Sequence, residues 1–314
     1  MTLEPGLMEA IEEVAAVRRD EPLSRHTTIG IGGPADAYVS VENAAQLSGT
    51  LRLCAEAGAP VFILGSGSNI VVGDKGMRGV TIENRAHALS EPARLAGDRE
   101  TYFLRAEAGC SFAAISRQLA FGGMEGLEWA CGIPGTVGGA VVYNAGAYGG
   151  CLGDVLQRAG LYDPVRGEIV LEASEMGLVY RGSAFTRGLM QGRSVLWAEF
   201  TLWPGDASEL RARVADYDAR RLKAQPRGRN AGSFFKNPPE HPAWKLLDSV
   251  GLRGYQIGGA QFSDKHCNFL INAGGATAAD VASLMHEAQR RVREEYGLEL
   301  VNEVTLVGEG FGDE

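Results

Sequence analysis

The spacing of apolar side chains predicts four amphipathic helices. In each segment, apolar residues recur every three or four positions and form one stripe, which is typical of a helix that packs one face against a core. Ser111 and Thr277 precede two of these segments as capping residues, and Gly122 and Gly297 follow their ends. The expected helices are residues 44–57, the run from Ser111 to Gly122, residues 208–224 and the run from Thr277 to Gly297.

Short runs of β-forming residues lie between these helices. They are residues 37–41, 61–64, 79–82, 102–106, 156–162, 169–171, 195–203, 268–271 and 304–307. Helices and strands are mixed without a regular βαβ order, which favours an α+β fold over a doubly wound parallel sheet. Pro204-Gly205-Asp206 closes a long strand before a charged helix. We therefore expect a domain boundary there, with domains at 1–204 and 205–314.

A first glycine-rich loop directly follows the apolar run 61–64. Its residues are Gly65, Ser66, Gly67, Ser68 and Asn69. In a glycine-rich turn after a strand, consecutive backbone N–H groups can converge on a phosphate. A Rossmann loop is the alternative, but Ile70 stands where its third glycine belongs, and residues 70–74 predict a strand and a turn instead of a helix. The pattern therefore disfavours a Rossmann site.

A second loop, residues 132–139, is richer still in glycine. Half of its eight residues are glycine, and the following segment to Gly149 adds more. Because glycine has no side chain, the main chain of this loop is uncovered, and a ligand can approach it closely. The loop predicts contact with a flat or anionic ligand.

Composition and charge narrow the class of partner. Glycine makes up 43 of the 314 residues, about twice its usual share. The formal net charge of −9, with no block of Lys and Arg, argues against nucleic acid but leaves small anions possible. Residues 129–153 are uncharged, yet too rich in glycine for a membrane span. Five cysteines without metal-site spacing, and no expected signal peptide, indicate a cytoplasmic protein with reduced thiols and no metal.

Residues 26–35, the loop 65–69 and the segment 132–149 together resemble the bacterial UDP-N-acetylenolpyruvoylglucosamine reductase (MurB) family. The resemblance runs from about residue 25 to 308. It implies an FAD-binding fold of the vanillyl-alcohol-oxidase (PCMH) type in two subdomains, within residues 1–204 with a core at about 34–204. A C-terminal α+β substrate domain would follow at 205–314. Non-covalent FAD would contact all five residues of the first loop, Arg221, and Gly132, Ile133, Pro134, Gly135, Thr136, Gly138 and Gly139.

Three later motifs, at 180–185, 230–238 and 300–304, resemble the catalytic segments of the same family. The family passes hydride from NADPH to FAD, and then to C3 of the enolpyruvyl ether of UDP-N-acetylglucosamine, which forms UDP-N-acetylmuramate for peptidoglycan. Negative charge develops on C2 and its carboxylate, where preorganised donors act best. Arg181 and a protonated Glu303 suit that charge, and Ser233 resembles the proton donor to C2. A nucleophilic Ser233 is disfavoured, because no Gly-x-Ser-x-Gly turn surrounds it.

The resemblance also supplies substrate-binding candidates. These are Tyr180, Asn237, Lys245 and Gln256, of which the lysine suits a diphosphate. Thr305 departs from the family, which often has a basic residue two positions after the glutamate. The short interval between Tyr180 and Ser233 resembles the subtype that lacks a tyrosine-bearing loop over the substrate. We expect a monomer or weak oligomer without nucleic-acid or membrane partners.

Two alternatives remain open from the residues alone. An alcohol or sugar oxidase of the related flavoproteins would keep the fold and tether flavin through His26, His87 or Cys110. A flavin or nucleotide sensor would keep the loops without catalysis, but it has no use for the set Arg181, Ser233 and Glu303.

Overall fold

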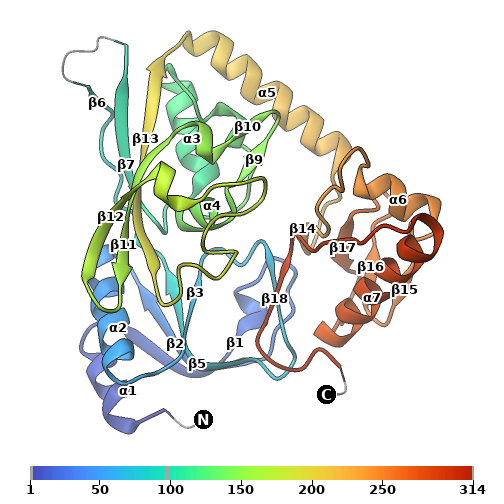
Figure 1. The fold of residues 1–314 in the computed structure, drawn as a ribbon, viewed down its shortest axis with the longest axis horizontal. Coiled ribbons are helices and arrows are strands. Elements are labelled where there is room, and N and C mark those ends of the chain that lie inside the picture. The colour runs from blue at the N-terminus through green and yellow to red at the C-terminus, as the bar shows by residue number, and fades with distance from the viewer. Residues whose placement is uncertain (1–2, 96–99, 313–314) are drawn as a thin grey trace. The chain divides into compact units, whose positions relative to one another are not determined.

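The computed structural model describes residues 3–95 and 100–312, which fold into two compact units (Figure 1). The first unit takes the chain up to Arg18, Tyr38–Gly65 and Val80–Arg221. The second takes Arg19–Ala37, Ser66–Gly79 and the chain from Leu222 onward. The units are therefore discontinuous in sequence and do not coincide with a division after residue 204.

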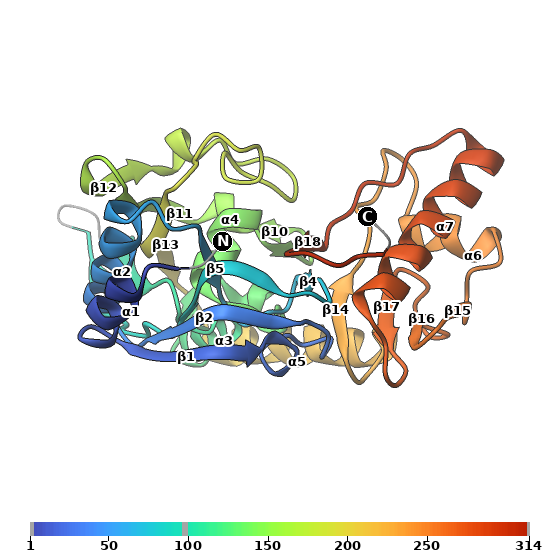
Figure 2. The same ribbon diagram turned by 90° about the horizontal axis from the view of Figure 1, so that it is seen from below.

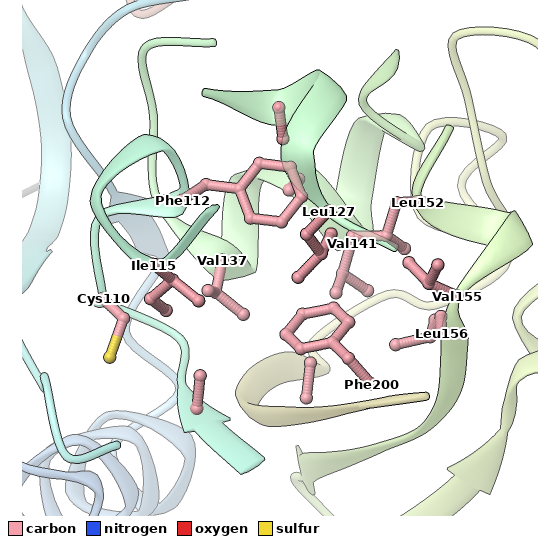
Figure 3. Close-up of a cluster of buried hydrophobic side chains, with 14 of the residues drawn as sticks. Cys110, Phe112, Ile115, Leu127, Val137, Val141, Leu152, Val155, Leu156 and Phe200 are labelled. Atoms are coloured by element: carbon pink, nitrogen blue, oxygen red, sulfur yellow. The ribbon is translucent and has the colours of Figure 1, made fainter. Parts of the chain in front are cut away.

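An antiparallel sheet in the first unit has the strand order β12-β11-β13-β7-β6, with β8 pairing the end of β13. Helix α4 packs against β13, and side chains of α3 join the same core. Figure 3 shows Phe112, Val141 and Phe200 turned into this cluster of buried side chains. The elements are β6 (Ala93–Arg94), β7 (Tyr102–Glu107), α3 (Phe112–Phe121), β8 (Met124–Glu125), α4 (Val137–Tyr143), β11 (Leu156–Asp163), β12 (Gly167–Glu172) and β13 (Ser194–Pro204).

A second sheet has the order β1-β2-β5-β3, in which β3 and β5 run parallel. Helices α1 and α2 contact each other. Three of the five unit boundaries fall inside strands, because the chain passes from one unit to the other within β1, β2 and β5. The elements are α1 (Pro5–Glu12), β1 (Ala16–Pro22), β2 (Pro34–Val41), α2 (Ala44–Glu56), β3 (Val61–Leu64) and β5 (Met77–Asn84).

The second unit contains an antiparallel sheet in the order β14-β17-β16-β15, and helix α7 packs on it (Figure 2). A separate parallel pair joins β18 to β4. The hydrophobic core of the second unit fully buries Phe234, Phe235 and Phe262. The elements are β4 (Ile70–Val72), β14 (Asn230–Ser233), α6 (Ala243–Ser249), β15 (Gln256–Ile257), β16 (Ala260–Phe262), β17 (Phe269–Asn272), α7 (Ala278–Tyr296) and β18 (Thr305–Val307).

All four predicted helices and all nine predicted strands form, with ends shifted by at most a few residues. The side chains of Ser111 and Thr277 cap α3 and α7, as their positions predict. The predicted strand at 70–72 also forms as β4, in keeping with the argument against a Rossmann loop. The expected α+β fold is confirmed.

Several short elements are not predicted by the sequence. Helix α4 begins inside the second glycine loop, where glycine's poor helix propensity hides it. Helix α6 spans less than two full turns and begins without a side-chain cap. The hairpin β9 (Gly146–Ala147) and β10 (Gly150–Cys151) turns at residues with positive φ. The 3-10 helices are Leu23–Arg25, Glu128–Ala130, Leu152–Asp154 and Ala173–Met176.

Helix α5 (Ala207–Ala224) explains why the first compact unit extends beyond residue 204. Its N-terminus is capped by Asp206, whose carboxylate accepts hydrogen bonds from Ser208 and Glu209. Leu210 and Val214 are buried against α3 and the segment after it. The helix therefore folds with the first unit almost to its end. Within the described residues, no helix combines the length and apolar character that crossing a bilayer requires.

Candidate active site

In the second unit, the first glycine-rich loop contains backbone N–H groups that have no acceptor among the described residues. Gly67 has φ +62°, and a Cβ atom there would lie 2.1 Å from the His26 carbonyl oxygen, so this position requires glycine. Its own carbonyl accepts the N–H of Thr28 at 3.0 Å. Among the described residues, none accepts the N–H of Ser66 or Gly67. Two adjacent backbone donors therefore remain for an anion such as a phosphate.

Asn69 connects this loop to the predicted catalytic glutamate. Its side-chain amide donates to the Glu303 carbonyl oxygen at 3.1 Å, and its own carbonyl accepts the N–H of Thr305 at 3.0 Å. The parallel pairing of Ile70 with Thr305 continues this contact into β4 and β18. The fold thus brings a cofactor candidate and a catalytic candidate together across 234 positions of sequence.

The main chain next to Ser233 is hydrogen-bonded to the main chain of Glu303. The Phe234 carbonyl oxygen accepts the N–H of Glu303 at 2.8 Å and that of Val304 at 3.3 Å. Both candidates are half-buried. Gly232 has φ +85°, a backbone conformation that favours glycine. A Cβ atom there would meet nothing within 4 Å, so there is space beside Ser233.

The substrate candidates of the second unit lie at its surface. Asn237, Lys245 and Gln256 are all exposed. The Asn237 side-chain oxygen accepts the N–H of Ala243 at 2.9 Å, at the start of α6. The Lys245 ammonium lies 5.6 Å from the centre of the Trp244 ring, and the Gln256 amide donates to Gly258 at 2.8 Å. Their roles toward a substrate stay predictions.

In the first unit, the two glycine-rich loops meet. A Cβ atom on Gly65 would lie 2.7 Å from the Thr136 hydroxyl, so close contact there requires glycine. That hydroxyl caps α4 by accepting the N–H of Gly139 at 3.4 Å. Gly138 packs against Ala108, whereas a Cβ atom on Gly139 would meet protein only at 3.7 Å. Space therefore remains along the loop at Gly139.

The other residues of this loop are held by the main chain. The Ile133 N–H donates to the Ala130 carbonyl at 2.9 Å, and the Gly135 carbonyl accepts the N–H of Phe112 at 3.1 Å. Gly135 has φ +141°, between Pro134 and the cap of α4. The loop is thus fixed by its neighbours before any ligand binds.

Arg221 lies over the second loop. A Cβ atom on Gly132 would be 3.0 Å from the Arg221 Cδ atom. Burial lowers the pKa of this guanidinium, although Tyr148, Cys131 and Asp218 act in the opposite direction. Asp218 is engaged in a two-pronged ion pair with Arg117, with N–O distances of 2.8 and 2.6 Å. None of the described residues accepts a hydrogen bond from Arg221, so a desolvated cation stands beside the glycine loop.

Tyr180 and Arg181 occupy a tight turn of the first unit. Reciprocal hydrogen bonds of 2.9 and 3.1 Å between Val179 and Gly182 close the turn. Arg181 has φ +53°, a conformation that non-glycine residues adopt at a cost and that is concentrated at functional sites. Tyr180 is 62% exposed, and its ring centre lies 5.6 Å from the Arg181 guanidinium carbon.

The candidates for covalent flavin attachment all make contacts within the protein. Burial raises the pKa of Cys110 to about 11, and its thiol donates to the Ala88 carbonyl. The ring of His26 contacts Glu21 at 2.9 Å, and that of His87 contacts the Arg85 carbonyl at 3.0 Å. In the part of the chain that the structure describes, no cluster of His, Cys, Asp and Glu is suited to a metal ion.

Comparison with known proteins agrees with this geometry. Residues 35–171 match the family described as FAD binding domain, and residues 224–307 match the C-terminal domain of UDP-N-acetylenolpyruvoylglucosamine reductase. A UDP-N-acetylenolpyruvoylglucosamine reductase from Geobacter metallireducens is 43% identical, over 93% of this chain and 94% of its own. This chain belongs to the UDP-N-acetylenolpyruvoylglucosamine reductase family.

Two further relatives extend the match. UDP-N-acetylenolpyruvoylglucosamine reductase 2 from Symbiobacterium thermophilum is 41% identical, over 96% of both chains. The crystal structure of the enzyme (MurB) from Thermus caldophilus superposes with a TM-score of 0.77 at 33% identity, over 93% of this chain and 99% of that one. The family resemblance and the FAD-binding domain are thereby confirmed, and an oxidase is not favoured.

Proposed function

We propose that this chain reduces UDP-N-acetylglucosamine enolpyruvate to UDP-N-acetylmuramate with NADPH, through non-covalently bound FAD, in the synthesis of peptidoglycan precursors. Membership of the reductase family over nearly the whole chain is the observation that carries the proposal. The hydrogen bond from the Glu303 N–H to Phe234, the residue after Ser233, supports it, because the reaction needs both residues near the same developing anion.

FAD suits the donors of the glycine-rich loops. The free N–H groups of Ser66 and Gly67 would hold phosphate oxygens, and the unpaired guanidinium of Arg221 would meet an electron-rich or anionic part of the ligand. Other contacts would come from Gly65, Ser68, Asn69, Gly132, Ile133, Pro134, Gly135, Thr136, Gly138 and Gly139. Bound FAD would supply the chemistry of accepting hydride from NADPH and delivering it to the substrate.

The protein's own groups would stabilise the charge that this addition creates. Arg181, held in a strained turn, would pair with the substrate carboxylate. Glu303, if protonated, would donate a hydrogen bond to the same developing anion. Ser233 would give its hydroxyl proton to C2 and be refilled from water.

Substrate recognition would involve exposed groups. Tyr180, Asn237, Lys245 and Gln256 would contact the UDP-sugar, with the Lys245 ammonium on the diphosphate. Residues 1–204 would supply most of the contacts to FAD, and residues 205–314 most of the contacts to the substrate. This functional division differs from the two compact units. We also propose a cytoplasmic monomer or weak oligomer without nucleic-acid or membrane partners. The net charge of −9 and the five free cysteines support this proposal.

The decisive experiment follows the colour of the purified protein. We expect a flavin absorption spectrum that anaerobic NADPH bleaches and that the enolpyruvyl substrate then restores. The control adds UDP-N-acetylglucosamine, which lacks the reducible double bond and should leave the flavin bleached. Protein that takes up no FAD, or bleached flavin that the substrate leaves unchanged, would reject the proposal. Yellow colour that stays with acid-precipitated protein would favour the oxidase.

A further inference from the structure

The segment 234–236 follows Ser233 in the chain and pairs with the residues around Glu303. Phe234 accepts the N–H of Glu303, and the N–H of Lys236 donates to the Val301 carbonyl at 2.8 Å. An isolated β-bridge between Phe235 and Asn302 lies between these two contacts. Any shift of this short segment therefore moves the proton donor and the glutamate relative to each other.

One side chain from another strand region holds this segment. The Asn268 carbonyl oxygen accepts the N–H of Phe234 at 2.7 Å. The Asn268 side-chain oxygen accepts the N–H of Phe235 at 3.0 Å, and its amide nitrogen donates to the Phe235 carbonyl at 2.8 Å. The side chain thus satisfies both polar groups of one residue, as a neighbouring strand would.

The Asn268 side chain and the two phenylalanines beside it are buried and closely packed. Asn268 is only 4% exposed, and Phe234 and Phe235 are each 1% exposed. The Phe234 and Phe235 rings contact each other edge to face, with centres 5.2 Å apart. Phe269, the residue after Asn268, pairs with Ser233 in the register of β14 and β17. Because water does not reach these groups, losing the amide would leave two buried polar groups of Phe235 without partners.

We propose that Asn268 is a positioning residue, which fixes the main chain between Ser233 and Glu303 for proton delivery to the substrate. This inference rests on the function proposed above. Proton donation requires the hydroxyl within hydrogen-bond reach of the reacting carbon, and a displacement of about 1 Å can cost about 10²-fold in rate. Asn268 would act only through the backbone, without touching the reacting atoms.

Asn268→Ala tests the proposal, with Asn272→Ala as the matched control. Asn272 ends β17, the strand that Asn268 directly precedes. Its side chain likewise bonds to main-chain groups, donating to Ile29 at 3.1 Å and accepting from Gly274 at 3.1 Å. Both variants should lose thermal stability. Only Asn268→Ala should slow the return of flavin colour with the enolpyruvyl substrate, by about 10- to 100-fold. Anaerobic bleaching by NADPH should remain within about twofold of wild type in both variants.

The solvent deuterium isotope effect separates positioning from simple destabilisation. It should increase for substrate reduction in Asn268→Ala, because proton delivery becomes slower, and stay unchanged in Asn272→Ala. If Asn268→Ala does not fold, Asn268→Asp preserves the shape and the acceptor for Phe235, and should show a smaller change in the same direction.

The outcomes are distinct. An unchanged isotope effect, or equal slowing of both half-reactions in an Asn268 variant, would overturn the positioning role alone. A wild-type protein that bleaches with NADPH but is not recoloured by the substrate would overturn the proposed function, and the positioning role with it.

Discussion

Ser233 follows Gly232, whose φ of +85° turns the chain just before the proposed proton donor. A second unusual conformation occurs at Arg181, with φ +53°. The sequence marks Gly232 as a permissive position, but it gives no sign of strain at Arg181. Glycine adopts a positive φ readily, so only Arg181 carries backbone strain, which is maintained where the surrounding structure imposes it.

Removing the Ser233 hydroxyl should separate the two halves of the reaction. In Ser233→Ala we expect NADPH to bleach the flavin at the wild-type rate, because no proton to C2 is needed in that step. Recolouring by the enolpyruvyl substrate should slow by roughly 10²-fold or more, the scale of a lost general acid. Stopped-flow absorbance measures both steps. Ser249→Ala, at an exposed helical serine, is the control, and normal recolouring in Ser233→Ala would remove Ser233 from the mechanism.

At the scale of elements, α7 begins with a reciprocal cap. The Thr277 hydroxyl accepts the N–H of Asp280 at 3.1 Å, and the Asp280 carboxylate accepts the N–H of Thr277 at 3.0 Å. The same carboxylate accepts the N–H of Gly259 at 3.0 Å, which ties the helix to the turn between β15 and β16. Burial raises the pKa of Asp280, but these hydrogen bonds lower it more, so the net shift is downward.

The lowered pKa makes this contribution to stability pH-dependent. The carboxylate stabilises the folded protein above its unfolded pKa of about 3.9, and the benefit is lost as the pH falls through the lower folded pKa. Asp280→Asn should therefore reduce the free energy of unfolding at pH 7 by about 0.3–1 kcal/mol, and by less near pH 3. Urea unfolding at both pH values measures this. Thr277→Ala should reduce the free energy of unfolding by about 1 kcal/mol at both pH values. A loss in Asp280→Asn that is the same at pH 3 as at pH 7 would contradict the pH-dependent role of this carboxylate.

For the whole molecule, FAD would stabilise the folded protein, because a ligand that binds only the folded state shifts the unfolding equilibrium toward it. We expect removal of FAD to lower the thermal midpoint and its return to restore it. At a free concentration 100 times its Kd, the ligand adds about 2.7 kcal/mol to the free energy of unfolding. Differential scanning calorimetry measures the shift.

Riboflavin is the matched control for this measurement. It carries the ring system without the adenosine and without the pyrophosphate that the N–H groups of Ser66 and Gly67 would bind. At equal concentration it should raise the midpoint less than FAD does. Equal stabilisation by both ligands would argue against a phosphate site at this loop.

The sequence by itself determined the α+β fold, the main helices and strands, the two glycine-rich loops and the family. These features are local: capping residues such as Thr277, apolar periodicity and glycine clusters act within one segment. Short or glycine-rich elements such as α4 are not predicted by the sequence, because their local propensities oppose the structure that tertiary packing imposes.

Only the tertiary structure decided which segments meet. It divides the chain into discontinuous units, places Gly65 against Thr136, and connects Ser233 to Glu303 through Phe234. It also gives Asn268 its two hydrogen bonds to Phe235, where the sequence shows only a polar residue beginning an apolar strand. Contacts across 33 to 234 positions depend on how the whole chain packs, and no local pattern encodes them.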